Sequence, residues 1–312
     1  MDFTPSMNLY RQQKLKHVLS LRARIVEAVR RFFNANDYLE VETPIRMPAP
    51  VPEAHIEAVG SGDWFLQTSP ELCMKRLLAV GFPRIFQICK CFRQAERGQR
   101  HLPEITLLEW YRTDSTYQDL MNECETLVMN VACCMGSTDI LAYQGHHIKL
   151  APPWPRISVK DAFEKFASIS LEAALQKDRF DEIMAVQIEP RLGLSQPGFL
   201  VDYPACRAAL AKLKPEDPRY AERFELYIAG VELCNAFSEL TDPVEQRARF
   251  EHERALRHKA GKPVYPMPER FLAALKDLPA AAGNALGIDR LVMLFADAKH
   301  IDDVVAFPPE EL

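Results

Sequence analysis

The 312-residue sequence lacks both common glycine-rich nucleotide-binding motifs. Its 12 glycines form neither a Gly-x-x-x-x-Gly-Lys phosphate loop nor a Gly-x-Gly-x-x-Gly dinucleotide fingerprint. No apolar run approaches the ~20 residues of a membrane-spanning helix. The N-terminus also lacks the basic segment and apolar core of a secretory signal peptide. We therefore expect a cytoplasmic protein without membrane contact, which must bind any nucleotide by other means.

Paired zinc-binding cysteines and a dense basic surface are absent as well. The eight cysteines show no Cys-x-x-Cys spacing, which indicates buried, reduced thiols. The formal net charge is −5, and the few basic clusters (Lys14/Lys16, Arg22/Arg24 and the mixed run 247–262) are typical of solvated helix faces. Proteins that bind nucleic acid through phosphates usually need many cations on one face, so the composition argues against tRNA as a partner.

The order of predicted elements indicates an α+β fold with a large antiparallel sheet flanked by helices, because strands and helices do not simply alternate. Apolar periodicity predicts helices over 8–37, 117–135 and 243–259, and strands over 39–42, 64–68, 84–92, 104–112, 199–203 and 222–237. A helix should also follow Ser69-Pro70-Glu71, with Ser69 as its N-cap. The proline-rich segment 151–155 predicts a rigid linker into a helical insertion that ends near residue 195. We predict one domain over 1–312.

The segment from Phe92 to Tyr111 carries the strongest functional signal. Two strand-like runs flank a polar loop rich in Arg, Glu and His, which predicts a hairpin with cations at its tip. Arg presents a planar fork of donors that fits phosphate oxygens in pairs. Such a hairpin can hold a polyphosphate.

This segment resembles motif 2 of the class II aminoacyl-tRNA synthetases, in the version carried by lysyl-tRNA synthetases. Residues 32–44 resemble motif 1, which forms the dimer interface in that family. Residues 283–291 resemble motif 3, a strand-to-helix turn that ends in a phosphate-binding Arg. Three motifs in the expected order cover nearly the whole chain. The resemblance implies a class II catalytic domain, a homodimer, and activation of an amino acid with ATP and Mg²⁺.

The resemblance also implies roles for individual residues. Arg93, Glu239 and Arg290 would be catalytic, with Arg93 at the α-phosphate and Arg290 at the γ-phosphate. The implied ATP-binding residues are Arg93, Ala95, Glu96, His101, Ile105, Glu232, Leu233, Gly287 and Arg290. The implied amino-acid-binding residues are Ser69, Glu71, Tyr111, Asn235, Glu239 and Ala285. Glu232 and Glu239 would hold Mg²⁺, which favours one or two carboxylates together with phosphate oxygens.

Several positions depart from the family pattern. Ala95 replaces a Glu, although Glu96 follows it directly, and Ile105 replaces an adenine-stacking Phe. Ala236 replaces a Gly in the segment that carries Glu232 and Glu239. Ala285 replaces a Gly in motif 3, where its methyl group would crowd the amino-acid site. Crowding of this kind typically costs ~1–3 kcal/mol, enough to change which substrate is preferred.

The chain leaves no room before motif 1 for the β-barrel domain with which lysyl-tRNA synthetases read the anticodon. With Ser-Pro-Glu at 69–71, Leu-Leu-Glu-Trp-Tyr at 107–111 and Ala285, it resembles the short paralogues that attach (R)-β-lysine to a lysine of elongation factor P. That resemblance implies elongation factor P as the acceptor and β-lysine or lysine as the small-molecule substrate. Two alternatives remain: a truncated lysyl-tRNA synthetase-like enzyme, or a catalytically dead regulatory paralogue.

Overall fold

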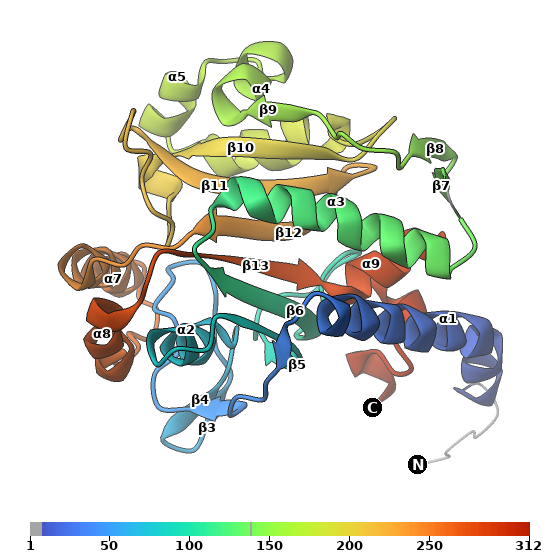
Figure 1. The fold of residues 1–312 in the computed structure, drawn as a ribbon, viewed down its shortest axis with the longest axis horizontal. Helices are drawn as coiled ribbons and strands as arrows, with labels where there is room; N and C mark the ends of the chain where they lie inside the picture. Colours follow the sequence, from blue (N-terminus) through green and yellow to red (C-terminus); the bar gives the residue numbers. More distant parts are fainter. Residues whose placement is uncertain (1–7, 138) are drawn as a thin grey trace.

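The computed structural model describes residues 8–137 and 139–312. Its centre is an eight-stranded sheet with the strand order β1-β5-β6-β13-β12-β11-β10-β9 (Figure 1). Adjacent strands are antiparallel except at the two edges, where β1 pairs with β5 and β9 with β10 in parallel. The strands are Leu39–Glu40 (β1), Arg84–Phe92 (β5), Glu104–Thr113 (β6), Arg156–Ser158 (β9), Gly198–Pro204 (β10), Tyr220–Ile228 (β11), Val231–Ser238 (β12) and Ala281–Gly287 (β13). With its flanking helices, this sheet confirms the predicted α+β class.

Three helices cover one face of the sheet. They are α1 (Asn8–Ala35), α3 (Tyr117–Cys134) and α9 (Ile288–Phe295), and α1 and α3 run across the front of the sheet in Figure 1. Successive side chains of a strand point to opposite faces. Leu108 and Trp110 of β6 therefore join the buried core under these helices, whereas Glu109 and Tyr111 face the other side.

The opposite face is covered only in part. Helices α2 (Glu71–Ala79), α7 (Pro243–Lys259) and α8 (Glu269–Ala274) lie at one end of it, and their apolar side chains form a second core with Tyr111 and Phe237. Two small sheets complete the fold. They consist of Arg46–Met47 (β2), Gly60–Ser61 (β3) and Trp64–Leu66 (β4), and of Ile140–Tyr143 (β7) and His146–Lys149 (β8).

Most predicted elements occur in the structure, but the expected strand run over 222–237 is divided. It forms β11 and β12, which pair as an antiparallel hairpin around Ala229 and Gly230. Both turn residues have positive φ, 52° and 70°. A two-residue turn with this conformation matches the twist of a hairpin, which explains why the chain reverses there.

The segment predicted as a helical insertion extends the main sheet. It begins with β9 and continues through α4 (Val159–Phe166), α5 (Leu171–Gln176), α6 (Phe180–Ile183), a π-helical turn (Met184–Ile188) and a 3₁₀ turn (Glu189–Arg191). Phe163 and Phe180 stack with ring centroids 5.5 Å apart. They belong to a core that includes Leu200 and Tyr227 of the sheet. The insertion is therefore packed onto the domain through its own apolar cluster.

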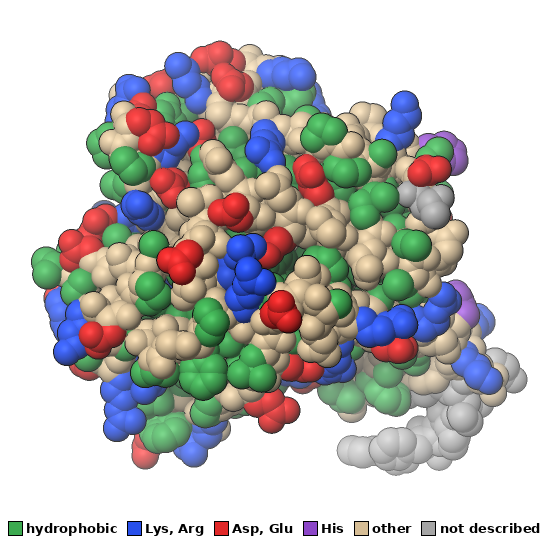
Figure 2. Space-filling view, viewed as in Figure 1, with side chains coloured by type: hydrophobic (Ala, Val, Ile, Leu, Met, Phe, Trp, Pro, Cys, Tyr) green, Lys and Arg blue, Asp and Glu red, His purple; other side chains and the backbone are tan. Residues whose placement is uncertain are grey.

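The surface in the view of Figure 2 shows Lys and Arg side chains interspersed with Asp and Glu, without a broad basic area among the described residues of this face. All eight cysteines are free thiols. Over the residues described, none of the helices combines the length and apolar character needed to span a bilayer.

Candidate active site

A cavity of about 350 Å³ lies on the open face of the central strands. Three of its residues form a row across the sheet, because Glu109 on β6 is the register partner of Ala285 on β13, which is the partner of Asn235 on β12. Register partners point to the same side of a sheet. Strand alternation and pairing therefore bring these three side chains together in the cavity.

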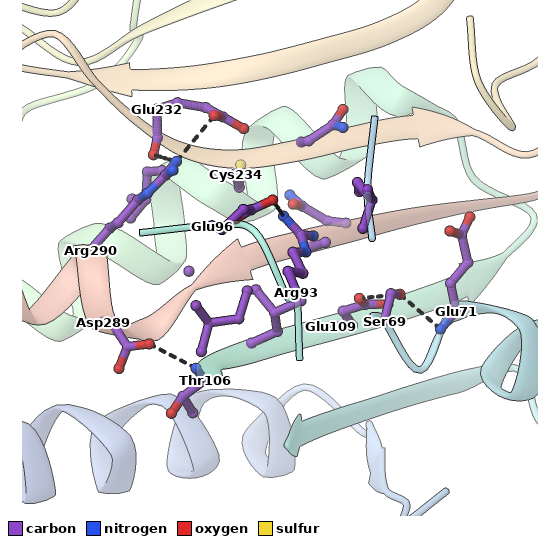
Figure 3. Close-up of a pocket in the computed structure, with 18 of the residues that line it drawn as sticks. Ser69, Glu71, Arg93, Glu96, Thr106, Glu109, Glu232, Cys234, Asp289 and Arg290 are labelled. Carbon is purple, nitrogen blue, oxygen red and sulfur yellow. Dashed lines mark hydrogen bonds and ion pairs between the residues drawn. The ribbon is translucent and has the colours of Figure 1, made fainter. Parts of the chain in front are cut away.

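Arg290 lies in the first turn of α9 and defines one end of the cavity (Figure 3). Its Nη1 donates to the Glu232 carbonyl oxygen at 2.8 Å and to Glu232 Oε2 at 3.1 Å. Its Nη2 donates to Nε2 of His101 at 2.6 Å, and Nε donates to the Arg100 carbonyl oxygen at 3.2 Å. These contacts hold a guanidinium group at the edge of the cavity.

The protonation states of His101 and Glu232 follow from their contacts with Arg290. Burial and the Arg290 cation both lower the pKa of His101, which favours the neutral ring that can accept from Arg290. Burial acts to raise the pKa of Glu232, but the cations Arg290, Arg223 and Arg93 together outweigh it and hold the pKa below the ordinary value. Glu232 is therefore an ionised carboxylate at neutral pH.

A carboxylate in the wall of the cavity fixes the start of α9. Asp289 Oδ2 accepts from the backbone N–H of Thr106 at 2.7 Å, and its Oδ1 accepts from Arg22 Nη1 at 2.6 Å. These bonds tie the start of α9 to β6 and α1. They position the neighbouring Arg290, and the motif 3 resemblance alone did not indicate them.

Arg93 occupies the middle of the cavity, in the loop that follows β5 (Figure 3). Its Nη1 lies 3.3 Å from Glu96 Oε1. Ile105 contributes to the same wall, whereas Ala95 is exposed and does not line the cavity. Glu96, one position after the family's Glu, thus lies beside the cation predicted to contact the α-phosphate.

Carboxylates and hydroxyl groups form the other end of the cavity. Glu109 is fully buried, and it accepts from Ser69 Oγ at 2.6 Å and from the Tyr111 hydroxyl at 2.7 Å. Burial, with a further contribution from the Glu71 charge, raises the pKa of Glu109 to about 7. The family resemblance includes Glu109 in the Leu-Leu-Glu-Trp-Tyr segment but gave it no role in the site. Its signal was an acidic residue inside the apolar strand run 105–111.

Ser69 is not the N-cap of α2, although the sequence predicted that role for it. The N-cap of α2 is Pro70, and Ser69 Oγ accepts from the backbone N–H of Glu71 at 3.0 Å while donating to Glu109. The prediction of Ser69 as N-cap was one residue out of register. The hydroxyl still binds an N–H of the first turn, and it also positions a cavity carboxylate.

Glu239 lies behind the cavity rather than in its lining. Lys75 is 2% exposed, and its Nζ pairs with Glu239 Oε2 and lies 2.5 Å from Glu71 Oε1. Burial lowers the pKa of Lys75, but Glu239 and Glu71 outweigh this effect and raise it, so Lys75 remains charged. Burial raises the pKa of Glu239 to about 8, although Lys75 opposes the shift.

Gly283 makes room for this packing. A Cβ atom at Gly283 would lie 2.2 Å from Cε1 of Tyr111 and 2.5 Å from Oε1 of Glu239. No side chain can occupy that space, so this position on β13 requires glycine.

The structure places most of the predicted site residues around one cavity. Those that line it are Ser69, Glu71, Arg93, Glu96, His101, Ile105, Tyr111, Glu232, Leu233, Asn235, Ala285, Gly287 and Arg290. Ala95 and Glu239 do not line it. The individual roles of all these residues stay predictions.

The side chains around the cavity could supply part of a Mg²⁺ coordination shell. Within 8–137 and 139–312, no group of three or more His, Cys, Asp and Glu side chains is arranged to hold a metal ion. Mg²⁺ typically takes one or two carboxylates and completes its shell with phosphate oxygens and water. Glu232 offers a carboxylate in the cavity, whereas Glu239 is engaged by Lys75.

Comparison with known proteins places this site in a family. Residues 4–311 match the family described as tRNA synthetases class II (D, K and N). A protein from Pectobacterium carotovorum subsp. carotovorum, named elongation factor P–(R)-β-lysine ligase, is 42% identical over 308 residues, which cover 93% of this chain and 94% of that protein. Proteins of the same name from Proteus mirabilis (42% identity, 92% and 93% coverage) and Vibrio cholerae (41%, 93% and 94%) are similarly close.

The chain therefore belongs to the class II tRNA synthetase family. Membership implies the use of ATP by an amino-acid-activating ligase. The predicted recognition of this family from three ordered motifs is confirmed.

Proposed function

We propose that this protein is an ATP-dependent ligase that activates (R)-β-lysine as an adenylate and transfers it to a lysine side chain of elongation factor P. The observation that best supports this proposal is a cavity with cations at one end and carboxylates at the other. The chain that forms it is 42% identical to a protein named for this reaction. Arg93 and Arg290 suit a polyphosphate, and Glu71 and Glu109 suit an ammonium group.

In the first step, the substrate carboxylate attacks the α-phosphorus of ATP in line, and pyrophosphate leaves. The protein contributes position and charge rather than a covalent intermediate. Arg93 would bind the α-phosphate, where charge accumulates during attack. Arg290 would bind the γ-phosphate, with neutral His101 supporting its guanidinium group. Their fixed contacts mean that little reorganisation is needed when the reaction occurs.

We propose that Mg²⁺ accompanies ATP and that Glu232 supplies a protein ligand. Its Oε2 binds Arg290, and Oε1 has no hydrogen-bond partner among the described residues. When bound, the ion would neutralise charge on the phosphates. The assignment of Glu239 as a second ligand remains a prediction that requires its separation from Lys75.

Ala285 would set the choice of amino acid. Its position between Glu109 and Asn235 places a methyl group at the centre of the row that crosses the carboxylate end of the cavity. This methyl group narrows the space for a substrate with its amino group on the α-carbon. In β-lysine the amino group lies one carbon further from the carboxylate, so the carbon chain of the substrate would pass Ala285 along a different path. This difference supports the proposal of β-lysine.

We further propose that the protein is a homodimer whose interface includes the region around motif 1. The exposed apolar side chains of Leu39, Ile45 and Trp64 lie in or near this region and support the proposal. A folded acceptor protein can be held by shape and a few charge pairs. This mode suits a chain of net charge −5 better than binding of tRNA.

The test incubates the enzyme with ATP, Mg²⁺ and labelled β-lysine, together with elongation factor P or total tRNA. We expect label on a lysine of the protein as an acid-stable amide. Label in the tRNA fraction alone would support the truncated synthetase instead. Pyrophosphate exchange with α-lysine and β-lysine, measured in parallel, would report activation independently of the acceptor. Absence of exchange with both would favour a catalytically dead paralogue.

A further inference from the structure

A second cavity, of about 640 Å³, lies beside the first. The two share wall residues, which are Glu53, Ile56, Ala209, Leu210 and Asn235. The outer wall of the second cavity comes from α7, including Ala248 and Phe250, and from the segment 205–210. The second cavity therefore reaches the proposed active site at a junction that contains Glu53.

The segment that carries Glu53 is firmly anchored. Arg257 on α7 is fully buried, and its Nη1 donates to the carbonyl oxygens of Glu53 and Ile56 at 2.8 and 2.9 Å. The backbone N–H of Ala54 donates to Glu253 Oε2 at 2.7 Å. These contacts fix the backbone from the Glu53 carbonyl group to Ile56, so the Glu53 side chain extends from an anchored segment at the junction.

Glu53 differs from the other carboxylates that line the first cavity. Each of those has a charged or hydrogen-bonding partner: Glu71 with Lys75, Glu96 with Arg93, Glu109 with Ser69 and Tyr111, Glu232 with Arg290, and Asp289 with Arg22. Within 8–137 and 139–312, no side chain forms a hydrogen bond or ion pair with the Glu53 carboxylate. Its acceptor capacity is available to a ligand.

The charges around Glu53 suit a group that exchanges a proton near neutral pH. Burial raises the pKa of Glu53 to about 7, and the carboxylates of Glu71 on α2 and Glu253 on α7 act in the same direction. The cations Arg93, after β5, and Arg223, on β11, oppose the shift. A base is most effective when its pKa lies near the working pH.

We propose that the second cavity admits the lysine side chain of the acceptor protein and that Glu53, at the junction, accepts a proton from its ammonium group. This inference rests on the proposed function and deepens it, because adenylate formation by itself requires no such base. The acceptor lysine arrives protonated at neutral pH, and only its neutral amine can attack.

The chemical step balances without a further reactant. One ammonium proton passes to the Glu53 carboxylate, which leaves a neutral amine. The nitrogen lone pair attacks the carbonyl carbon of the adenylate, a C–N bond forms, and the C–O bond to the phosphate breaks. AMP leaves with the bonding electrons, and the nitrogen loses its second proton to the departing phosphate or to solvent. Glu53 then returns its proton to solvent.

The experiment separates the two half-reactions in Glu53→Gln, which keeps the side-chain shape but removes the base. Pyrophosphate exchange measures activation, and single-turnover transfer of β-lysine from the preformed adenylate to elongation factor P measures the second step. In Glu53→Gln, we expect the rate of transfer to fall by ~10²-fold or more beyond any fall in the rate of pyrophosphate exchange. A positioned base usually contributes a factor of this size. Glu57→Gln is the matched control, since Glu57 lies in the same segment, pairs with Lys262 at 3.3 Å and lines neither cavity.

A second acceptor distinguishes a proton-transfer role from a structural one. Hydroxylamine is already a neutral nucleophile at pH 7 and needs no base, so its reaction with the adenylate should be nearly equal in wild type and Glu53→Gln. Ala248→Trp should block the second cavity, and it should lower transfer to the protein more than reaction with hydroxylamine.

The outcomes separate this inference from the proposed function. If the wild type activates β-lysine but transfers none to elongation factor P, the proposed function fails. If the wild type transfers and Glu53→Gln does so equally well, Glu53 is not the base. A parallel loss of exchange and transfer in Glu53→Gln would instead assign Glu53 to binding of ATP or amino acid, and would overturn the inference. Unchanged transfer in Ala248→Trp would place the acceptor path elsewhere.

Discussion

Replacing Glu109 with Gln tests the carboxylate end of the active site most directly. The side chain is fully buried and receives hydrogen bonds from Ser69 and Tyr111. Gln has nearly the same shape and can keep one of these bonds, but it carries no charge for a substrate ammonium group. A hydrogen bond to a charged group contributes ~1.5–3 kcal/mol. Because each ~1.4 kcal/mol is a factor of ten, we expect KM for the amino acid to rise ~10–150-fold.

The pH dependence of the same substitution gives a second, independent measurement. The pKa of Glu109 is raised to about 7, and only the ionised form attracts a cation. About a tenth of the carboxyl groups are ionised one unit below the pKa and about nine tenths one unit above it. The wild-type KM for the amino acid should therefore be about tenfold higher at pH 6 than at pH 8. In Glu109→Gln this difference should largely disappear.

Pyrophosphate exchange with β-lysine at saturating ATP provides the assay for both effects. Glu104→Gln is a suitable control, because Glu104 begins the same strand but is exposed and pairs with Lys90 at 3.1 Å. A Glu109→Gln enzyme with the wild-type KM and the wild-type pH profile would refute the assignment of an ammonium group to this carboxylate.

Four further predictions address other parts of the molecule. Arg290→Ala should lower the rate of exchange by ~10²–10³-fold, as for removal of one preorganised donor; near-normal exchange would contradict its phosphate role. Ala285→Gly should raise kcat/KM for α-lysine relative to β-lysine, and an unchanged ratio would show that this methyl group does not set selectivity. Gly283→Ala should lower the free energy of unfolding in urea by ~1–3 kcal/mol through overpacking, whereas Gly98→Ala, with no atom within 4 Å of its added Cβ, should change it little. The free energy of unfolding of the ligand-free protein should fall as pH rises from about 5 to 8. The reason is that the pKa values of Glu109 and Glu239 are raised to about 7 and about 8 in the folded chain, so the unfolded chain releases these protons at lower pH. If Glu109→Gln does not reduce this pH dependence, Glu109 does not titrate in this way.

The sequence alone determined the class of fold and much of the site. Apolar periodicity placed the β5–β6 hairpin within a residue of its observed ends, because local alternation and turn chemistry control strand boundaries. Most of the residues that the resemblance selected also line the first cavity, and three motifs carry that resemblance. Their order along the chain carries this information, since each motif belongs to a different strand or helix end that the sheet then assembles.

Only the tertiary structure decided which of these side chains are free to act. The family resemblance implied that Glu232 and Glu239 share one metal site. In the structure, Glu239 instead pairs with Lys75, which lies 164 positions earlier in the chain. Glu109 was distinguished only as an acidic residue inside an apolar strand run, and Glu53 had no distinguishing local pattern. Their importance depends on burial, on the charges around them and on the meeting of two cavities. Such properties arise from contacts between distant segments, so the sequence specifies the chemical groups while packing determines their charge and their partners.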